Sequence, residues 1–197
     1  MHRMAKSSEE KYQAILNAAT ESFAEYGYFN CQISRIAKLA GVADGTIYLY
    51  FKNKEDILVS LFKDRMGQFI DEISQTTLKC PSTKERLLHL IRTHLKYMQE
   101  NRSLAMVTQI EVRQSNPGIR DAISEPLRKY FQIIEQVLTE GAEKGEIILA
   151  DIKVGRQMIF GTLDAVISDW VTSKKPRSLK GTEDIVFELI CGAFKIK

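Results

Sequence analysis

The sequence has few of the residues that build disulfide frameworks or thiolate metal sites. Its three cysteines, Cys31, Cys80 and Cys191, lie far apart, and no C-x-x-C pair occurs. An odd number of widely spaced cysteines argues against a disulfide framework, and the missing pair argues against a zinc site. We therefore expect three reduced thiols that behave as small apolar side chains, no metal site and a reducing cytoplasm.

Long apolar runs are also missing. The longest apolar-looking stretch, residues 158–171, is interrupted by Asp164 and Asp169 and is too short to span a bilayer. Residues 1–12 are polar and lack the apolar stretch of a signal peptide. The sequence therefore predicts a cytoplasmic protein with no membrane partner.

Motifs for catalysis are scarce. No Gly-x-Ser-x-Gly elbow occurs, and His89 and His94 do not have the i, i+4 spacing of a metal pair on a helix. We predict a protein that is not an enzyme; an enzyme acting on acyl groups and a purely structural helical dimer are the alternatives from other classes. The formal net charge is only +3, so any affinity for nucleic acid must come from a local patch.

What the sequence does contain is apolar residues at helical spacing. Hydrophobic residues make up 44% of the 197 residues and charged residues 27%, which is enough apolar material for a core. No strand-like alternation persists, so the pattern predicts an all-α fold of about nine helices. We expect these helices at about 7–26, 33–40, 44–50, 53–80, 83–100, 102–115, 119–144, 151–173 and 181–194.

Local signals mark several helix ends. The segment Ser7-x-x-Glu10 has the form of a capping box, Asp44 is a suitable cap for the third helix, and Asn53 begins the fourth. Gly27 and Gly41 are typical helix stops. The fourth helix carries a long apolar stripe and is expected to run from the first part of the chain into the second.

Two domains follow from this organisation. Residues 1–52 are predicted to form a helix-turn-helix DNA-binding domain, because two short helices flank a tight turn at Gly41. Residues 53–197 are predicted to form a helical ligand-binding and dimerisation domain. The core between the two short helices is expected to contain Ile36, Ala37, Val42, Ile47 and Phe51.

The outward residues of the first domain suit contact with duplex DNA. Gly45 permits close approach of the backbone, and the hydroxyls of Thr46 and Tyr50 can donate to phosphate oxygens. Tyr48 can lie against bases or a thymine methyl group. The residues expected to contact DNA are Ser34, Asp44, Gly45, Thr46, Tyr48, Leu49, Tyr50, Lys52 and Lys54. The alternative is that the tyrosines pack against the body and the lysines form a solvated face.

The segment 36–54 closely resembles the DNA-binding domain of the TetR family of bacterial regulators, whose motif runs roughly I-A-x-x-A-G-V-x-x-G-T-x-Y-x-Y-F-x-x-K. Every fixed position is present, from Ile36 through Lys54. Two features depart from the family: Cys31 stands where Thr commonly caps the second helix, and Ala43-Asp44 stands where Ser-Lys is common. The resemblance therefore implies DNA binding but does not transfer an operator sequence.

Segments 42–58, 109–116 and 156–164 resemble, more narrowly, the acyl-CoA-responsive TetR-type regulators of fatty-acid degradation found in bacilli. This resemblance implies a repressor of fatty-acid degradation genes that long-chain acyl-CoA releases from DNA, with no cofactor besides that effector. The alternative is a TetR-type repressor that responds to another hydrophobic ligand, a drug or a metabolite.

An acyl chain needs apolar walls, and the coenzyme A phosphates need cations. The apolar candidates are Met66, Phe69, Ile70, Leu95, Met98, Met106, Ile110, Ile134, Phe160 and Leu163. The cationic candidates are Arg92, Lys96 and Arg113, of which Arg113 has Glu111 or Asp164 as alternative partners. Each apolar residue has simple core packing as its alternative.

The family resemblance also implies a homodimer built from the last two long helices of each subunit. Gly161, Ala165 and Ser168 place small residues at helical spacing, and Trp170 is expected to anchor the interface. The last helix carries the apolar residues Ile185, Phe187, Leu189, Ile190 and Phe194. Such a dimer presents two recognition helices to successive major grooves, roughly 34–36 Å apart, and so predicts double-stranded DNA with a pseudo-palindromic operator.

Overall fold

The computed structural model describes residues 2–114, 117–176 and 178–196, and all regular secondary structure in these ranges is helical. The elements are α1 (His2–Tyr26), α2 (Ile33–Ala40), α3 (Asp44–Ile47), α4 (Lys54–Thr77), α5 (Thr83–Glu100), α6 (Arg102–Met106), η1 (Val107–Glu111), α7 (Val112–Gln114), α8 (Pro117–Glu143), α9 (Ile152–Thr172) and α10 (Thr182–Phe194). Because α6, η1 and α7 are continuous, these ranges hold nine helical rods, which confirms the all-α prediction. The predicted end of the sixth helix at residue 115 lies outside the described residues.

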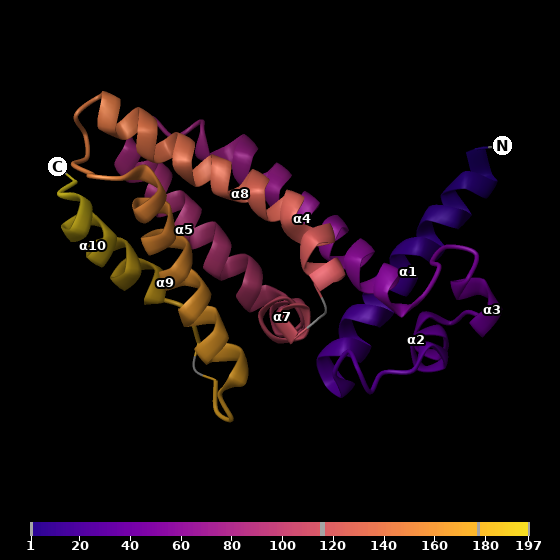
Figure 1. Ribbon diagram of the computed structural model, residues 1–197. Helices are drawn as coiled ribbons and strands as arrows, with labels where there is room; N and C mark the ends of the chain where they lie inside the picture. Colours follow the sequence, from indigo (N-terminus) through magenta and orange to yellow (C-terminus); the bar gives the residue numbers. More distant parts are fainter. Residues whose placement is uncertain (1, 115–116, 177, 197) are drawn as a thin grey trace.

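The first three helices form a small head at one end of the molecule (Figure 1). Ile36, Ala37 and Ile47 are fully buried and Phe51 is almost so, whereas Val42 is half-buried. Gly41 ends α2 in the left-handed region at φ +69°, a conformation that a side chain disfavours. The predicted core of the two short helices is therefore present.

Three local predictions in the head were wrong. Helix α1 begins at His2, so Ser7 lies inside the helix and does not cap it. The N-cap of α3 is Ala43, and Asp44 lies in the first turn, where the helix dipole favours a carboxylate without a cap hydrogen bond. Helix α3 also ends at Ile47 and not at residue 50, because the amides of Tyr50 and Phe51 both return to the Ile47 carbonyl in a tight turn.

Helix α4 joins the head to the body. Its N-cap is Asn53, as predicted, and the Asn53 Oδ1 accepts a hydrogen bond from the Asp56 amide at 2.8 Å. From there α4 leaves the head and packs along α8 (Figure 1). Its buried stripe includes Ile57, Leu61 and Ile73, and it ends at Thr77, three residues before the predicted end at residue 80.

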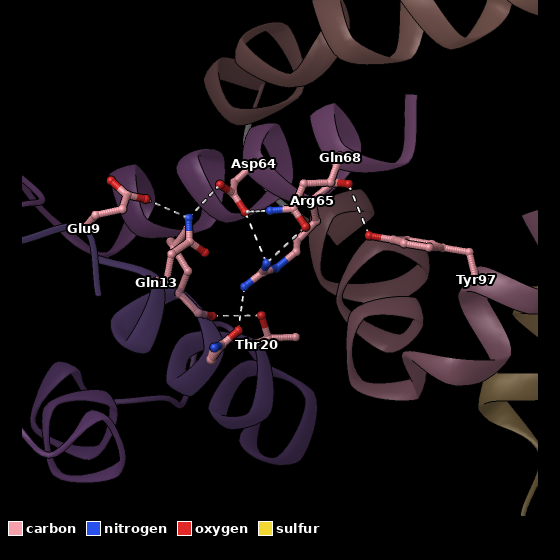
Figure 2. Close-up of polar contacts among 9 residues, drawn as sticks. Glu9, Gln13, Thr20, Asp64, Arg65, Gln68 and Tyr97 are labelled. Atoms are coloured by element: carbon pink, nitrogen blue, oxygen red, sulfur yellow. Dashed lines mark hydrogen bonds and ion pairs between the residues drawn. The ribbon is translucent and has the colours of Figure 1, made fainter. Parts of the chain in front are cut away.

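A polar network holds α1 against α4 where head and body meet (Figure 2). The Arg65 guanidinium donates to Asn17 Oδ1 at 2.5 Å, and the Gln13 amide donates to Asp64 at 3.1 Å. From α5, the Tyr97 hydroxyl donates to the Arg65 backbone carbonyl at 3.2 Å (Figure 2). One stretch of α4 is thus bonded to both the head and the body.

Helices α5, α8, α9 and α10 and the α6–η1–α7 rod form the rest of the body, and α9 and α10 lie at the end away from the head (Figure 1). Within the described ranges, no helix is both long and apolar enough to cross a membrane.

Candidate nucleic-acid interface and ligand cavity

The surface around α3 presents several of the predicted DNA-contacting residues to solvent. Tyr48 is 57% exposed and Leu49 is 81% exposed, which is unusual for such large apolar groups. Asp44, Gly45 and Lys52 are also exposed, and Thr46 is half-buried. Between α2 and α3, one shallow concavity brings together Ser34, Asp44, Tyr48 and Lys54.

Two of the predicted DNA-contacting residues are engaged within the protein. The Tyr50 ring lies 6.4 Å from the Tyr12 ring of α1, and its hydroxyl accepts a hydrogen bond from Ser8 at 3.3 Å. The Lys54 ammonium donates to the carbonyls of Phe29 and Cys31 at 3.0 and 3.1 Å. Lys54 therefore fixes the α1–α2 loop to the start of α4, and Tyr50 fixes the α3–α4 turn to α1.

Two cations of α2 were not predicted from the sequence to contact DNA. Arg35 and Lys38 are exposed, and the Arg35 guanidinium lies 3.8 Å above the ring of Tyr26. The spacing of three residues between them places both cations on one face of α2, next to Ser34, and could have indicated that they belong to the DNA-contacting surface.

A cavity of about 290 Å³ lies in the body between α4, α5, α8, α9 and the α6–η1–α7 rod. This volume is at the lower end of the range of about 300–1,000 Å³ that small-molecule sites occupy. Its walls are mainly apolar and aromatic. The lining residues are Phe62, Met66, Phe69, His94, Met98, Thr108, Gln109, Val112, Arg113, Arg120, Ile123, Ser124, Leu127, Tyr130, Phe131, Phe160 and Asp164.

Only some of the residues predicted for the ligand line this cavity. Those that do are Met66, Phe69, Met98, Arg113 and Phe160. Those that do not are Ile70, Arg92, Leu95, Lys96, Met106, Ile110, Ile134 and Leu163. Ile134 and Leu163 are fully buried core residues, and Arg92 and Lys96 form exposed ion pairs with Asp184 and Glu100. Helical spacing identified buried faces but could not say which of them border a void.

The aromatic and polar side chains that α5, α8 and η1 bring to the cavity were not predicted from the sequence. Tyr130 and Phe131 follow one another in α8, and the Phe131 ring packs edge-on against Phe160 at 4.9 Å. Gln109 comes from η1 and accepts a hydrogen bond from Ser168 at 2.9 Å. In the sequence, the two consecutive aromatic residues at 130 and 131 could have indicated that α8 brings aromatic side chains to the cavity.

One end of the cavity is charged. Arg113 pairs with Asp164 of α9, which settles the choice of partner that the sequence left open. Arg120 and Ser124 of α8 line the same cavity and are exposed. This end can therefore meet a charged part of a ligand while remaining open to water.

The opposite end of the cavity contains a buried histidine–tyrosine pair. His94 Nδ1 and the Tyr130 hydroxyl are 2.6 Å apart, and the two side chains are 4% and 1% exposed. Burial lowers the pKa of His94 to about 4 and raises the pKa of Tyr130. Both side chains are therefore neutral at neutral pH.

The π-helical segment η1 connects the cavity to the head. Thr108 and Gln109 line the cavity, and two residues further on the buried Glu111 turns to the other side. The Glu111 carboxylate accepts the backbone N–H of Tyr28, in the loop after α1, at 2.7 Å. A single turn thus contacts both the cavity and the head, and π-helical turns are frequent at functional sites.

An exposed apolar stripe runs along α9 and α10. Ile185 and Leu189 are 61% and 67% exposed, and Val154 and Met158 are 51% and 40% exposed. Trp170, expected to anchor this surface, is instead 8% exposed, with the Arg102 guanidinium 5.7 Å from its ring. Ile190 and Phe194 are likewise buried and Phe187 is half-buried, so only one face of α10 carries exposed apolar groups.

Comparison with known families matches nearly the whole chain. Residues 15–61 match the model for "Bacterial regulatory proteins, tetR family", and residues 62–193 match the model for "YsiA-like protein, C-terminal region". The two matches meet between residues 61 and 62, within α4.

The chain is also similar to individual regulators. It is 47% identical to the fatty acid metabolism regulator protein of Bacillus subtilis (strain 168), covering 94% of this chain and 96% of that protein. A crystal structure of the transcriptional regulator FadR from Bacillus subtilis in complex with stearoyl-CoA superposes with a TM-score of 0.87 at 47% identity, covering 91% of this chain and 97% of that one. The fatty acid degradation regulator FadR from Bacillus halodurans gives a TM-score of 0.87 at 44% identity, covering 92% and 98%.

Proposed function

The chain belongs to the TetR family of bacterial regulatory proteins, and from that premise we propose that it represses fatty-acid degradation genes and that long-chain acyl-CoA releases it from DNA. The observation that carries the proposal is the 47% identity to a fatty acid metabolism regulator over 94% of this chain. The stearoyl-CoA complex of the similar FadR structure supports the choice of effector. A protein that acts on chromosomal DNA works in the bacterial cytoplasm.

We propose that the head binds DNA through the surface around α3. Tyr48 and Leu49 project from it, and Ser34 and Asp44 flank the concavity between α2 and α3. Lys52 is exposed next to this surface and is available for a phosphate. Lys54 and Tyr50 contribute mainly by holding this surface in place.

We propose that two copies pair through the stripe on α9 and α10. Val154, Met158, Ile185 and Leu189 are exposed aliphatic side chains on these two helices, and exposed apolar surface commonly marks a protein interface. Gly161 and Ala165 lie exposed on α9 beside this row and permit close approach of a partner helix. A two-fold dimer presents two heads and therefore selects a pseudo-palindromic operator.

We propose that the ligand acts on the head by two mechanical connections. Helix α4 supplies Met66 and Phe69 to the cavity and Arg65 to the bond with Asn17 of α1. The η1 turn supplies Gln109 to the cavity and Glu111 to the bond with the Tyr28 amide. A ligand that prefers one position of these turns shifts the population of head orientations, and a change from 1:99 to 99:1 requires a preference of about 10⁴-fold.

The first experiment measures DNA binding by electrophoretic mobility shift. DNA from upstream of the protein's own gene and of fatty-acid degradation genes is tested with and without long-chain acyl-CoA, with free fatty acid and free coenzyme A as controls. We expect specific binding that acyl-CoA alone abolishes. Specific binding that acyl-CoA leaves unchanged would exclude the proposed effector, and absence of specific binding would exclude the proposed operators.

A matched pair of variants tests the DNA surface. Tyr48→Ala is expected to weaken specific DNA binding about tenfold or more, because each base contact contributes about 1–3 kcal/mol and the dimer loses two. Tyr48→Phe, which keeps the ring, is expected to lose less. Both variants should bind acyl-CoA as the wild type does, and equal DNA affinity in all three proteins would place the base contacts elsewhere.

A further inference from the structure

The ligand cavity contains a hydrogen-bond donor that the protein itself does not use. His94 is 4% exposed and lines the cavity, with its Nδ1 bonded to the Tyr130 hydroxyl at 2.6 Å. Among the contacts between described residues, the other ring nitrogen, Nε2, has no hydrogen-bond partner. Phe69 packs against both the His94 and the Tyr130 ring, with ring centroids 5.3 Å apart in each pair.

The hydrogen bonds of the His94–Tyr130 pair indicate which of the two ring nitrogens of His94 carries the proton. A buried phenol normally donates its hydrogen, and among the described residues His94 Nδ1 is the only partner recorded for the Tyr130 hydroxyl. Tyr130 therefore donates to Nδ1, which accepts. Because burial keeps the ring neutral, its single proton is on Nε2. The cavity thus presents a neutral N–H donor.

We infer that His94 is a specificity residue, whose Nε2–H donates a hydrogen bond to the thioester carbonyl oxygen of a bound acyl-CoA. The inference rests on the proposed function and adds to it the group by which the cavity distinguishes an acyl thioester from an equally apolar chain. A buried donor left without an acceptor lowers the affinity for any ligand that lacks one.

The arrangement of polar groups along the cavity favours the thioester over other parts of the ligand. Arg120 and Tyr130 are ten residues apart on α8, which corresponds to about 15 Å of helix. Cations therefore lie at one end and the neutral donor at the other. A coenzyme A thioester has the same order, with phosphates and carbonyl separated by the pantetheine arm. Met66 and Met98 also line the cavity, and their flexible side chains can adapt to an acyl chain.

The test compares an acyl-CoA with the S-alkyl coenzyme A thioether of the same chain length, which replaces the carbonyl by a methylene group. Dissociation constants are measured by isothermal titration calorimetry on the full chain. We expect the wild type to bind the thioester about tenfold more tightly than the thioether, which is the effect of one buried hydrogen bond. In His94→Gln, whose amide can still donate, we expect most of this ratio to remain.

A double variant separates the donor from the fold. His94→Leu alone leaves the Tyr130 hydroxyl buried without a partner, so His94→Leu/Tyr130→Phe, which removes both polar groups, is the variant to use. We expect it to bind both ligands with similar affinity. A tenfold ratio that persists in the double variant, or a ratio near one in the wild type, would overturn the inference and leave the proposed effector in place. Failure of the wild type to bind either compound would overturn the effector as well.

Discussion

At the scale of single residues, His94 links the cavity to the stability of the fold. Its pKa of about 4 in the native state lies below the ordinary histidine value near 6.5 that applies in the unfolded chain. Between these values the unfolded state binds the proton and the native state does not, so stability is complete above about pH 6.5 and decreases as the pH falls toward 4.

The size of this loss gives a prediction. We expect His94 to contribute a decrease of about 3 kcal/mol in the free energy of unfolding between pH 7 and pH 4, because one pKa unit corresponds to about 1.4 kcal/mol. Urea denaturation at a series of pH values measures it. Carboxylates also titrate in this range, so His94→Gln is the control, and its pH dependence should be flatter. Parallel curves for the two proteins would show that His94 is protonated in the native state.

At the scale of elements, η1 is one of two short connections between the cavity and the head, and α4 is the other. A rod interrupted by a π-helical turn places Gln109 at the cavity and Glu111 at the Tyr28 amide within two residues. Lys54 donates to the carbonyls of Phe29 and Cys31 within the same loop. In the proposed mechanism, a displacement of η1 by ligand is transmitted through these bonds to the loop that precedes α2.

Replacement of Glu111 tests this path. We expect Glu111→Leu to bind acyl-CoA within about threefold of wild type but to reduce, by at least about fivefold, the factor by which acyl-CoA changes the DNA dissociation constant. Glu111→Gln keeps an acceptor oxygen for the Tyr28 amide and should retain most of that factor. Fluorescence anisotropy with labelled operator, with and without ligand, gives the factor. If Glu111→Leu keeps the wild-type factor, coupling runs through α4 alone.

At the scale of the whole molecule, the head lies at one end and α9 and α10, which carry the proposed dimer surface, lie at the other (Figure 1). The cavity lies in the body between α4, α5, α8, α9 and the α6–η1–α7 rod. In a dimer that pairs through α9 and α10, the distance between the two heads depends on the orientation and internal packing of each body. A small change in the cavity can therefore alter the head separation. This arrangement accounts for an effector that need not touch the DNA surface.

Disruption of the stripe on α9 and α10 tests the assembly. Leu189→Lys is expected to convert the dimer to a monomer and to weaken operator binding at least about tenfold, because two heads must bind together. Leu189 is 67% exposed in the single chain, so the helical content should be unchanged. Leu78→Lys, at an exposed apolar position after α4, is the matched control. Sedimentation equilibrium measures the state, and a Leu189→Lys dimer would place the interface elsewhere.

The sequence by itself determined the all-α class and the helix-turn-helix of the head. The head's signals are local: Gly41 ends one short helix in a left-handed conformation, and the core of Ile36, Ala37, Ile47 and Phe51 is encoded within 16 consecutive residues. Because nearby residues specify this unit, the family motif and the fold of the head could be predicted together. The comparisons with known proteins confirmed the resemblance to the TetR family.

Only the tertiary structure decided where the cavity lies and which residues face it. His94 and Tyr130 are separated by 36 positions, and Arg113 and Asp164 by 51. Helical periodicity marks the buried face of each helix, but a void forms where faces of several helices fail to meet, which no single helix encodes. Trp170 shows the same limit, since its burial depends on the neighbouring α6 rod. Local chemistry therefore fixed the DNA-binding element, and long-range packing fixed the sensor.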